Sequence, residues 1–213
     1  MVAGKTVELV ISGIGGQGNV KAAQILGTAA VRAGLRVRVS DTFGISQRGG
    51  PVLSHVRIGA VYGSMVVAHS ADAVVGLEPM EALRAASQFL KPGGIVIMST
   101  RTVYPVEVNT GKAEYPPLSA ILDALRIAAG RVITLDATEV ALSSGIPMAA
   151  NVVMLGVLAG TGLLPFGPEY VEQSIRELIP RSVEENIRAF RAGLAIGAPS
   201  KRDDFSSPEK MAG

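Results

Sequence analysis

Residues 7–18, VELVISGIGGQG, join a short apolar run directly to a glycine-rich turn. The apolar run is typical of a buried strand. After the turn, apolar side chains recur at intervals of three and four, which predicts a helix over residues 17–33. Strand, tight turn and helix in this order form the first unit of a doubly wound α/β sheet.

The next hundred or so residues repeat this alternation. Further strands are predicted at residues 36–40, 73–77, 95–98 and 132–135, and further helices at residues 80–90 and 118–129. Because these strands are apolar throughout rather than at every second residue, helices are expected to cover both faces of the sheet. We therefore expect an α/β fold with a doubly wound, mostly parallel, Rossmann-like sheet.

Two segments depart from the alternation. Residues 52–67, VLSHVRIGAVYGSMVV, have a period of two that Gly59 and Gly63 interrupt, which predicts an inserted antiparallel hairpin. Residues 149–164 are the most apolar stretch, yet they are shorter than the roughly 20 residues of a bilayer span. They predict a buried helix or a subunit contact, and they leave self-association open.

The chain is expected to form one domain with a short tail. Helices are predicted after residue 168 and over residues 183–194. These C-terminal helices complete a domain of residues 1–198, because a chain of 213 residues does not need a second core. Residues 199–213 are polar and aperiodic, so we expect a flexible tail.

The composition excludes several classes of function. With five Phe, four Tyr and no Trp, the chain has few rings on which nucleic-acid bases could stack. The absence of cysteine excludes disulfides, thiolate nucleophiles and cysteine-ligated clusters, and His55 and His69 supply too few ligands for a metal site. The first residues show no signal-peptide pattern, so we expect a cytoplasmic location and no membrane partner.

The glycine turn is the first candidate site. Gly13, Gly15, Gly16, Gln17 and Gly18 satisfy the pattern G-x-G-x-x-G between a strand and a helix. Glycines let the backbone approach a ligand closely, and the amides at a helix N-terminus favour an anion. A tight turn without a ligand is the alternative, and it stays open.

The loop over residues 42–50, TFGISQRGG, is the second candidate site. Gln47 and Arg48 supply an amide and a guanidinium that suit a carboxylate or a phosphate. Gly49 and Gly50 would let the backbone come close to that ligand. The alternative is a flexible loop whose arginine binds a neighbouring carbonyl.

Other polar residues give weaker indications. Asp41 ends the second predicted strand, where an acidic residue would bind the ribose of an NAD-type cofactor, so an NAD(P)-binding reductase stays open. Glu78 follows the strand at residues 73–77 and is expected to cap the next helix. His55 is expected to be a hydrogen-bonding residue rather than a catalyst. No nucleophile and base can be paired, so we assign no catalytic residue and expect a subunit that holds an anion.

Four segments together carry a family resemblance. They are GIGGQG at residues 13–18, SQRGGPVLSHVRIG at 46–59, LEPMEALR at 77–84 and NVVMLGVLA at 151–159. The chain resembles the gamma-domain family of 2-oxoacid:ferredoxin oxidoreductases, which includes the beta subunit of indolepyruvate:ferredoxin oxidoreductase. The resemblance covers about residues 7–194.

This resemblance implies a subunit of an enzyme that oxidatively decarboxylates a 2-oxo acid with coenzyme A and passes electrons to ferredoxin. It implies that thiamine diphosphate and [4Fe-4S] clusters belong to a larger partner subunit, through which ferredoxin is reached. It also implies that the glycine turn approaches an anion such as coenzyme A, and that Gln47 and Arg48 face the substrate or coenzyme A. A free-standing NAD(P)-binding reductase and a purely structural subunit remain the alternatives.

Overall fold

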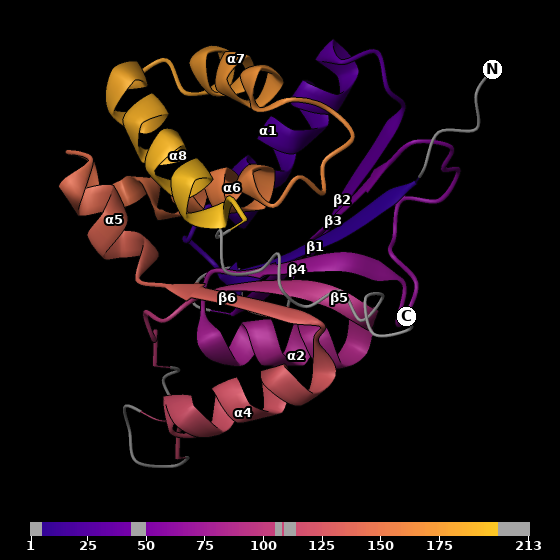
Figure 1. The fold of residues 1–213 in the computed structure, drawn as a ribbon, viewed down its shortest axis with the longest axis vertical. Coiled ribbons are helices and arrows are strands. Elements are labelled where there is room, and N and C mark those ends of the chain that lie inside the picture. The colour runs from indigo at the N-terminus through magenta and orange to yellow at the C-terminus, as the bar shows by residue number, and fades with distance from the viewer. Residues whose placement is uncertain (1–5, 44–49, 105–107, 109–113, 200–213) are drawn as a thin grey trace, which may run out of the picture.

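A computed structural model describes residues 6–43, 50–104, 108 and 114–199 of the chain. A central sheet separates two layers of helices (Figure 1). Its strands are β1 (Val7–Ile14), β2 (Val37–Phe43), β3 (Pro51–Ile58), β4 (Ala71–Gly76), β5 (Leu90–Ser99) and β6 (Arg131–Leu135). The order across the sheet is β2-β3-β1-β4-β5-β6.

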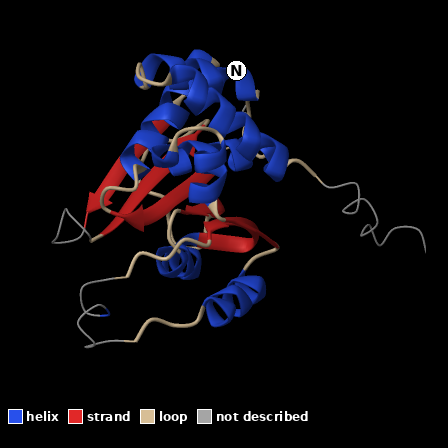
Figure 2. Ribbon diagram, turned by 90° about the vertical axis from the view of Figure 1, so that its left-hand side faces the viewer, coloured by secondary structure: helices blue, strands red, loops and turns tan. Residues whose placement is uncertain are grey.

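The helices lie on both faces of the sheet, as predicted. One layer contains α1 (Asn19–Arg32), α5 (Ala137–Ser143), η1 (Pro147–Ala149), α6 (Ala150–Gly160), α7 (Pro168–Leu178) and α8 (Val183–Gly197). The opposite layer contains α2 (Pro79–Phe89) and α4 (Leu118–Ala128). Figure 2 shows the same three layers after a quarter turn. Because β1 pairs with β4, β4 with β5 and β5 with β6 in parallel, the doubly wound α/β fold is confirmed.

The inserted antiparallel element differs from the predicted hairpin. β3 is the first arm, but residues 59–70 contain no strand. Instead β3 pairs antiparallel with β1 on one side and with β2 on the other. Because both edges of β3 are occupied, it has no edge left for a second arm over residues 59–67. The sheet is therefore mixed, and the antiparallel partner within the insertion is β2.

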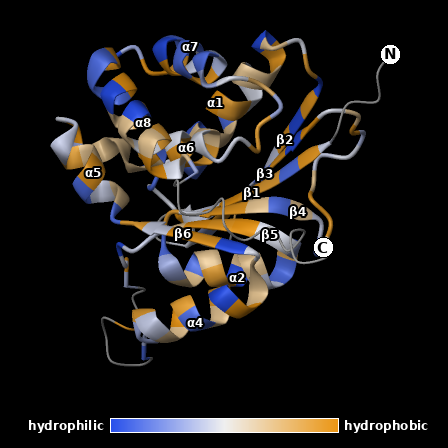
Figure 3. Ribbon diagram, viewed as in Figure 1, coloured by the Kyte–Doolittle hydropathy of each residue, from blue (hydrophilic) through white to orange (hydrophobic). Residues whose placement is uncertain are grey.

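The most apolar predicted helix is buried within the chain itself. Within residues 149–164 the α-helix is α6, which contacts the sheet, α1 and α8, and its residues from Asn151 to Leu158 are all buried. Figure 3 shows β1 mostly in hydrophobic colours, whereas hydrophilic residues are frequent on the outer helix α7. Among the described residues, no helix is long and apolar enough to cross a membrane. Beyond residue 199, the predicted tail lies outside the described residues.

Candidate functional site

The glycine turn connects β1 to α1 in a backbone conformation that requires glycine. Gly16 has a φ of 105° and Gly18 a φ of 87°, both in the left-handed region that other residues rarely adopt. A Cβ atom at Gly16 would have no heavy atom within 4 Å, so this residue borders open space. The turn therefore exposes its backbone at Gly16, as a site that admits a ligand requires.

No side chain of the described residues caps the amides at the start of α1. Elsewhere in the turn, the amide of Ile14 donates to Gln17 Oε1 at 2.7 Å and that of Gly15 to the Gly50 carbonyl at 2.8 Å. By contrast, the N-cap residue Gly18 supplies no side-chain cap, and the first turn of α1 contains no acidic residue. The first amides of a helix have no partner within the helix, and the helix dipole makes this end attractive to negative charge.

Gln17 holds the turn in place. Its Oε1 accepts from the amide of Ile14, and its Nε2 donates to the Leu77 carbonyl at 3.1 Å. Leu77 directly follows β4, so the Gln17 side chain joins the carboxyl ends of two neighbouring strands. We predicted Gln17 as part of the anion-binding loop, and its amide group is already engaged with the protein at both ends.

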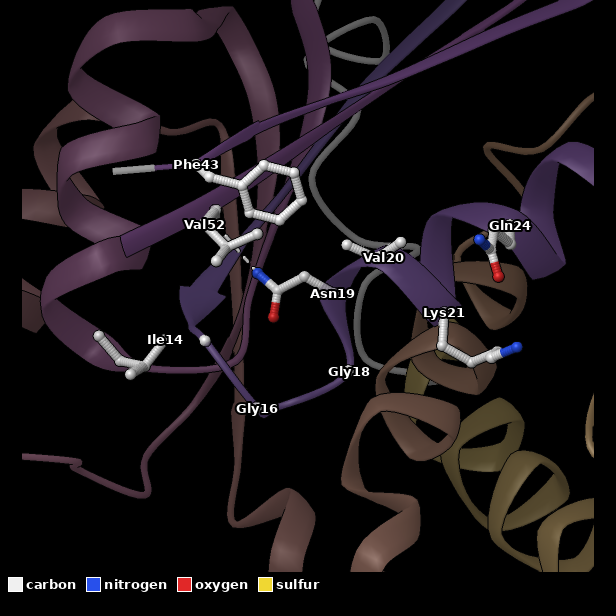
Figure 4. A pocket seen from close by; sticks show the side chains of 10 residues that line it. Ile14, Gly16, Gly18, Asn19, Val20, Lys21, Gln24, Phe43 and Val52 are labelled. Carbon is white, nitrogen blue, oxygen red and sulfur yellow. Dashed lines mark hydrogen bonds between the residues drawn. The ribbon is translucent and has the colours of Figure 1, made fainter. Parts of the chain in front are cut away.

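A cavity of about 460 Å³ opens beside the turn, toward β3 and β2 (Figure 4). We call it the larger cavity. Its lining residues are Ile14, Gly15, Gly16, Gly18, Asn19, Val20, Lys21, Gln24, Phe43 and Val52. Apolar side chains form part of the wall, and the exposed Lys21 adds a positive charge near the start of α1. The cavity therefore suits a ligand that combines an anionic group with apolar parts.

Two asparagines that sequence reasoning missed hold the start of α1. Asn19 Nδ2 donates to the Val52 carbonyl of β3 at 3.0 Å, as Figure 4 shows. Asn151 Nδ2 donates to the Gly18 carbonyl at 3.1 Å, and its Oδ1 accepts from the amide of Val152 at 2.9 Å. Asn151 is a lone amide in an otherwise apolar predicted helix, and this contrast is the signal that could have identified it.

The basic loop lies only partly within the described residues. Gln47, Arg48 and Gly49 lie outside them. Gly50 is buried, and its carbonyl accepts from the amide of Gly15 in the turn. Phe43, at the other end of the loop, lines the larger cavity. Both ends of the loop are thus anchored beside the glycine turn.

The position of Asp41 does not fit the ribose of a dinucleotide. In the Rossmann arrangement the acidic residue ends a strand adjacent to the first one. Here β3 lies between β2 and β1, which places Asp41 two strand spacings, about 10 Å, from β1. In addition, Ser54 Oγ donates to Asp41 Oδ1 at 2.5 Å. Asp41 therefore serves the pairing of β2 with β3.

His55 and Glu78 have structural contacts. His55 is fully buried, its Nδ1 accepts from the amide of Val66 at 3.3 Å, and its ring meets Phe89 edge to face. Burial lowers the pKa of His55, although the charge of Asp41 opposes this effect. Glu78 caps α2 as predicted, since its Oε2 accepts from the amide of Glu81 at 3.0 Å.

The surroundings of Glu78 are also buried and polar. Glu78 Oε1 accepts from the Tyr115 hydroxyl, and burial together with Glu78 raises the pKa of Tyr115. Burial raises the pKa of Glu81, while Arg84, which donates to it at 2.6 Å, opposes the rise. This cluster links the end of β4 to α2 and to the segment before α4, which is a structural role.

The described residues contain no group of three or more His, Asp or Glu side chains that could hold a metal ion. The chain also has no cysteine, so its residues do not fit an iron–sulfur cluster. What the site can do chemically is bind and orient an anion.

Comparisons with known proteins agree with one another. A family model described as pyruvate ferredoxin/flavodoxin oxidoreductase matches residues 8–196. A protein of Archaeoglobus fulgidus named indolepyruvate oxidoreductase subunit IorB is 43% identical over 88% of this chain and 93% of its own length. The protein of the same name from Thermococcus kodakarensis is 40% identical, over 89% of this chain and 95% of its own length.

A solved structure extends the comparison to three dimensions. The pyruvate oxidoreductase subunit PORC of Thermotoga maritima is 28% identical and superimposes with a TM-score of 0.64. The match covers 90% of this chain and 97% of that one. The similarity therefore extends over nearly the whole of both chains, in sequence and in fold.

Proposed function

The chain belongs to the pyruvate ferredoxin/flavodoxin oxidoreductase family, and we propose that it is the subunit without a redox centre in an indolepyruvate or related 2-oxoacid:ferredoxin oxidoreductase. The assembled enzyme would oxidatively decarboxylate a 2-oxo acid, form an acyl-coenzyme A and reduce ferredoxin. The observation that carries this proposal is the 43% identity, over 88% of the chain, to a protein named as an indolepyruvate oxidoreductase subunit. A cytoplasmic location is part of the proposal.

The absence of cysteine from this chain bears on which subunit holds the iron–sulfur clusters. A [4Fe-4S] cluster is held by cysteine thiolates, and this sequence has no cysteine. We therefore assign the clusters to a larger partner subunit, and the family resemblance leads us to assign thiamine diphosphate to the same partner. This chain would then be inactive alone. Its own task is to bind and orient a negatively charged ligand at the interface with that partner.

The glycine turn and the loop that follows β2 are the parts of this chain that we assign to the ligand. The amides at the start of α1, which no described side chain caps, and the charge of Lys21 favour a phosphate of coenzyme A or the carboxylate of the 2-oxo acid. Gly13, Gly15, Gly16 and Gly18 let the backbone approach it. The hydrogen bond from the Gly15 amide to the Gly50 carbonyl brings the end of the loop that carries Gln47 and Arg48 next to the turn. This supports a role for the loop in binding the same ligand.

Co-expression with the thiamine- and cluster-binding subunit tests this proposal. We expect the two chains to co-purify and to reduce ferredoxin only when indolepyruvate, or another 2-oxo acid, and coenzyme A are both present. The chain alone should be colourless and inactive. Turnover of a 2-oxo acid by the isolated chain, or full activity of the larger subunit without it, would contradict the proposal.

The NAD(P)-binding reductase is a distinct alternative that calorimetry separates. The position of Asp41, two strands from β1, counts against it. Titration of the isolated chain with NAD(H) and NADP(H) should therefore show no binding in the micromolar range. A purely structural subunit is separated by kinetics of the Arg48 variant described below.

A further inference from the structure

A second, smaller cavity lies on the other flank of the glycine turn. Its volume is about 150 Å³, and we call it the smaller cavity. Its lining residues are Gly16, Gln17, Leu77, Ser99, Arg101, Thr138, Pro147, Met148 and Ala150. They come from the carboxyl ends of β1, β4 and β5 and from α5, η1 and α6. Gly16 is thus shared by two cavities, one on each side of the turn.

The smaller cavity occupies the point at which the sheet reverses its winding. After β1 the chain crosses to the layer of α1, whereas after the neighbouring strand β4 it crosses to the layer of α2 (Figure 1). The two connections leave in opposite directions, and a crevice forms between them. In open α/β sheets, ligands bind in this crevice, outside the carboxyl ends of the strands. The larger cavity lies instead on the β3 side of β1.

The smaller cavity has the groups that an oxyanion needs. Arg101 is exposed, and its guanidinium makes no ion pair with any residue that the structure describes. Ser99 is only 2% exposed, and its Oγ accepts from the Arg101 amide at a long 3.5 Å. No bond donated by its hydroxyl is seen among the described residues, so the hydroxyl can donate to a ligand. A guanidinium beside hydroxyl donors suits a carboxylate or a phosphate group.

No acidic side chain among the described residues lines this cavity. Two acidic residues flank Thr138 along the chain, Asp136 and Glu139, and neither lines the cavity. Asp136 is the N-cap of α5, and its Oδ1 accepts from the amides of Thr138 and Glu139, both at 3.0 Å. Its carboxylate is therefore used as the cap of α5. The positive charge of Arg101 is left without a counter-ion among the described residues.

We propose that the smaller cavity is a second oxyanion subsite, separate from the larger cavity, in which Arg101 supplies the charge and Ser99 a hydrogen bond. Its volume is below the roughly 300 Å³ at which pockets for whole drug-sized ligands begin, so it holds one charged group. That group is a carboxylate or a phosphate. The subsite rests on the geometry of this chain and does not depend on the proposed function.

Binding of inorganic phosphate to the full chain tests the subsite. Calorimetry with wild type and Arg101→Met should show affinity that is about tenfold or more weaker in the variant, because a charged hydrogen bond is lost. Arg101→Lys should retain part of the affinity. Arg126→Met is the matched control, since Arg126 is exposed on α4 and pairs with Asp123. Circular dichroism establishes that each variant is folded.

Lys21→Met separates the two cavities, because Lys21 lines only the larger one. The proposal predicts that this variant keeps the phosphate affinity that Arg101→Met loses. It is overturned if the wild type does not bind phosphate, if Arg101→Met binds like wild type, or if Lys21→Met alone loses binding. The proposed function is judged by different measurements, which are co-purification with the larger subunit and ferredoxin reduction by the wild-type complex.

Competition then identifies the source of the bound group. Coenzyme A offers phosphates, and phenylpyruvate offers the carboxylate of an aromatic 2-oxo acid. If coenzyme A displaces phosphate from the wild type and phenylpyruvate does not, the subsite binds a phosphate group. If phenylpyruvate displaces phosphate and coenzyme A does not, the subsite binds a carboxylate group.

Discussion

Glycine serves opposite purposes in the pair of helices α6 and α8 and in the turn before α1. In the helix pair, a Cβ atom at Gly156 would lie 2.0 Å from the Phe190 carbonyl oxygen, and one at Gly193 would lie 2.1 Å from that of Val153. In the turn, a Cβ atom at Gly16 would have no neighbour within 4 Å. The first glycines allow two backbones to touch, and the second keeps a surface open to a ligand.

This contrast teaches how to interpret the abundant glycine of the chain. The 25 glycines suggest flexibility when they are taken as composition alone. Where a glycine faces another backbone, it permits close helix packing and is part of the core. A glycine with positive φ and open space beside it, such as Gly16, instead leaves its backbone accessible to a ligand.

The largest effect is expected from Gly156→Ala, which tests the packing side of the contrast. The new methyl group meets a backbone oxygen that cannot rotate away, so the free energy of unfolding should fall by about 3 kcal/mol. Urea denaturation measures this change. Gly162→Ala is the control, since its methyl group meets nothing within 4 Å and only the φ of 71° is unfavourable. Equal losses in the two variants would refute the packing explanation.

Arg48→Ala tests the ligand side of the contrast, in the loop that ends beside Gly15. Loss of one charged hydrogen bond, on the order of 1.5 to 3 kcal/mol, should raise the KM for coenzyme A or the 2-oxo acid by about tenfold or more. The cluster content of the complex should not change. Wild-type kinetics in the assembled variant would remove Arg48 from the site and favour a purely structural subunit.

Gly16→Ala should have an intermediate effect on stability. There is room for the methyl group, so only backbone strain remains, and the free energy of unfolding should fall by about 1 to 2 kcal/mol. A shift of the turn should also weaken phosphate binding in calorimetry. If this variant were as unstable as Gly156→Ala, the turn would be packed against something, and the contrast between the two regions would fail.

The smallest effect concerns pH and His55, which lies in neither region. Burial holds the pKa of His55 below 6.5, so as the pH falls below about 6.5 the unfolded chain takes up a proton that the folded chain resists. The free energy of unfolding should therefore decrease between about pH 7.5 and about pH 5.5. His55→Phe should show a smaller decrease in urea denaturation. An equal decrease in both proteins would assign the pH dependence to other groups.

Local patterns predicted most of the elements of this fold, but not α5, and they predicted a hairpin arm over residues 59–67 that is not a strand. The strand, turn and helix of residues 7–33 were recognised because burial periodicity and glycine placement are properties of neighbouring residues. The cap at Glu78 was predicted for the same reason. The position of β3 between β1 and β2 was not, because strand pairing joins residues far apart in sequence and its energy has no local signature.

The candidate site was predictable only in part. The glycine turn follows a motif, but Ser99, Arg101 and Asn19 reach the two cavities from separate elements. For Arg101 there was a usable indication, since it comes shortly after the predicted strand at residues 95–98. Polar residues after parallel strands often border the ligand crevice. The missing information was the strand order, which determines which of these strand ends lie together.

The placement of β3 also limits when β1 can pair during synthesis of the chain. Val7 of β1 pairs with Ile58 of β3, so the ribosome must synthesise the chain as far as β3, beyond β2, before β1 can pair with β3. Until then the N–H and C=O groups along this edge of the apolar strand β1 remain unpaired and available to other chains, and contacts of such long sequence separation form slowly. A nascent chain would therefore be most prone to aggregate in the interval before β3 is inserted, which makes this interval the natural point of action for a chaperone.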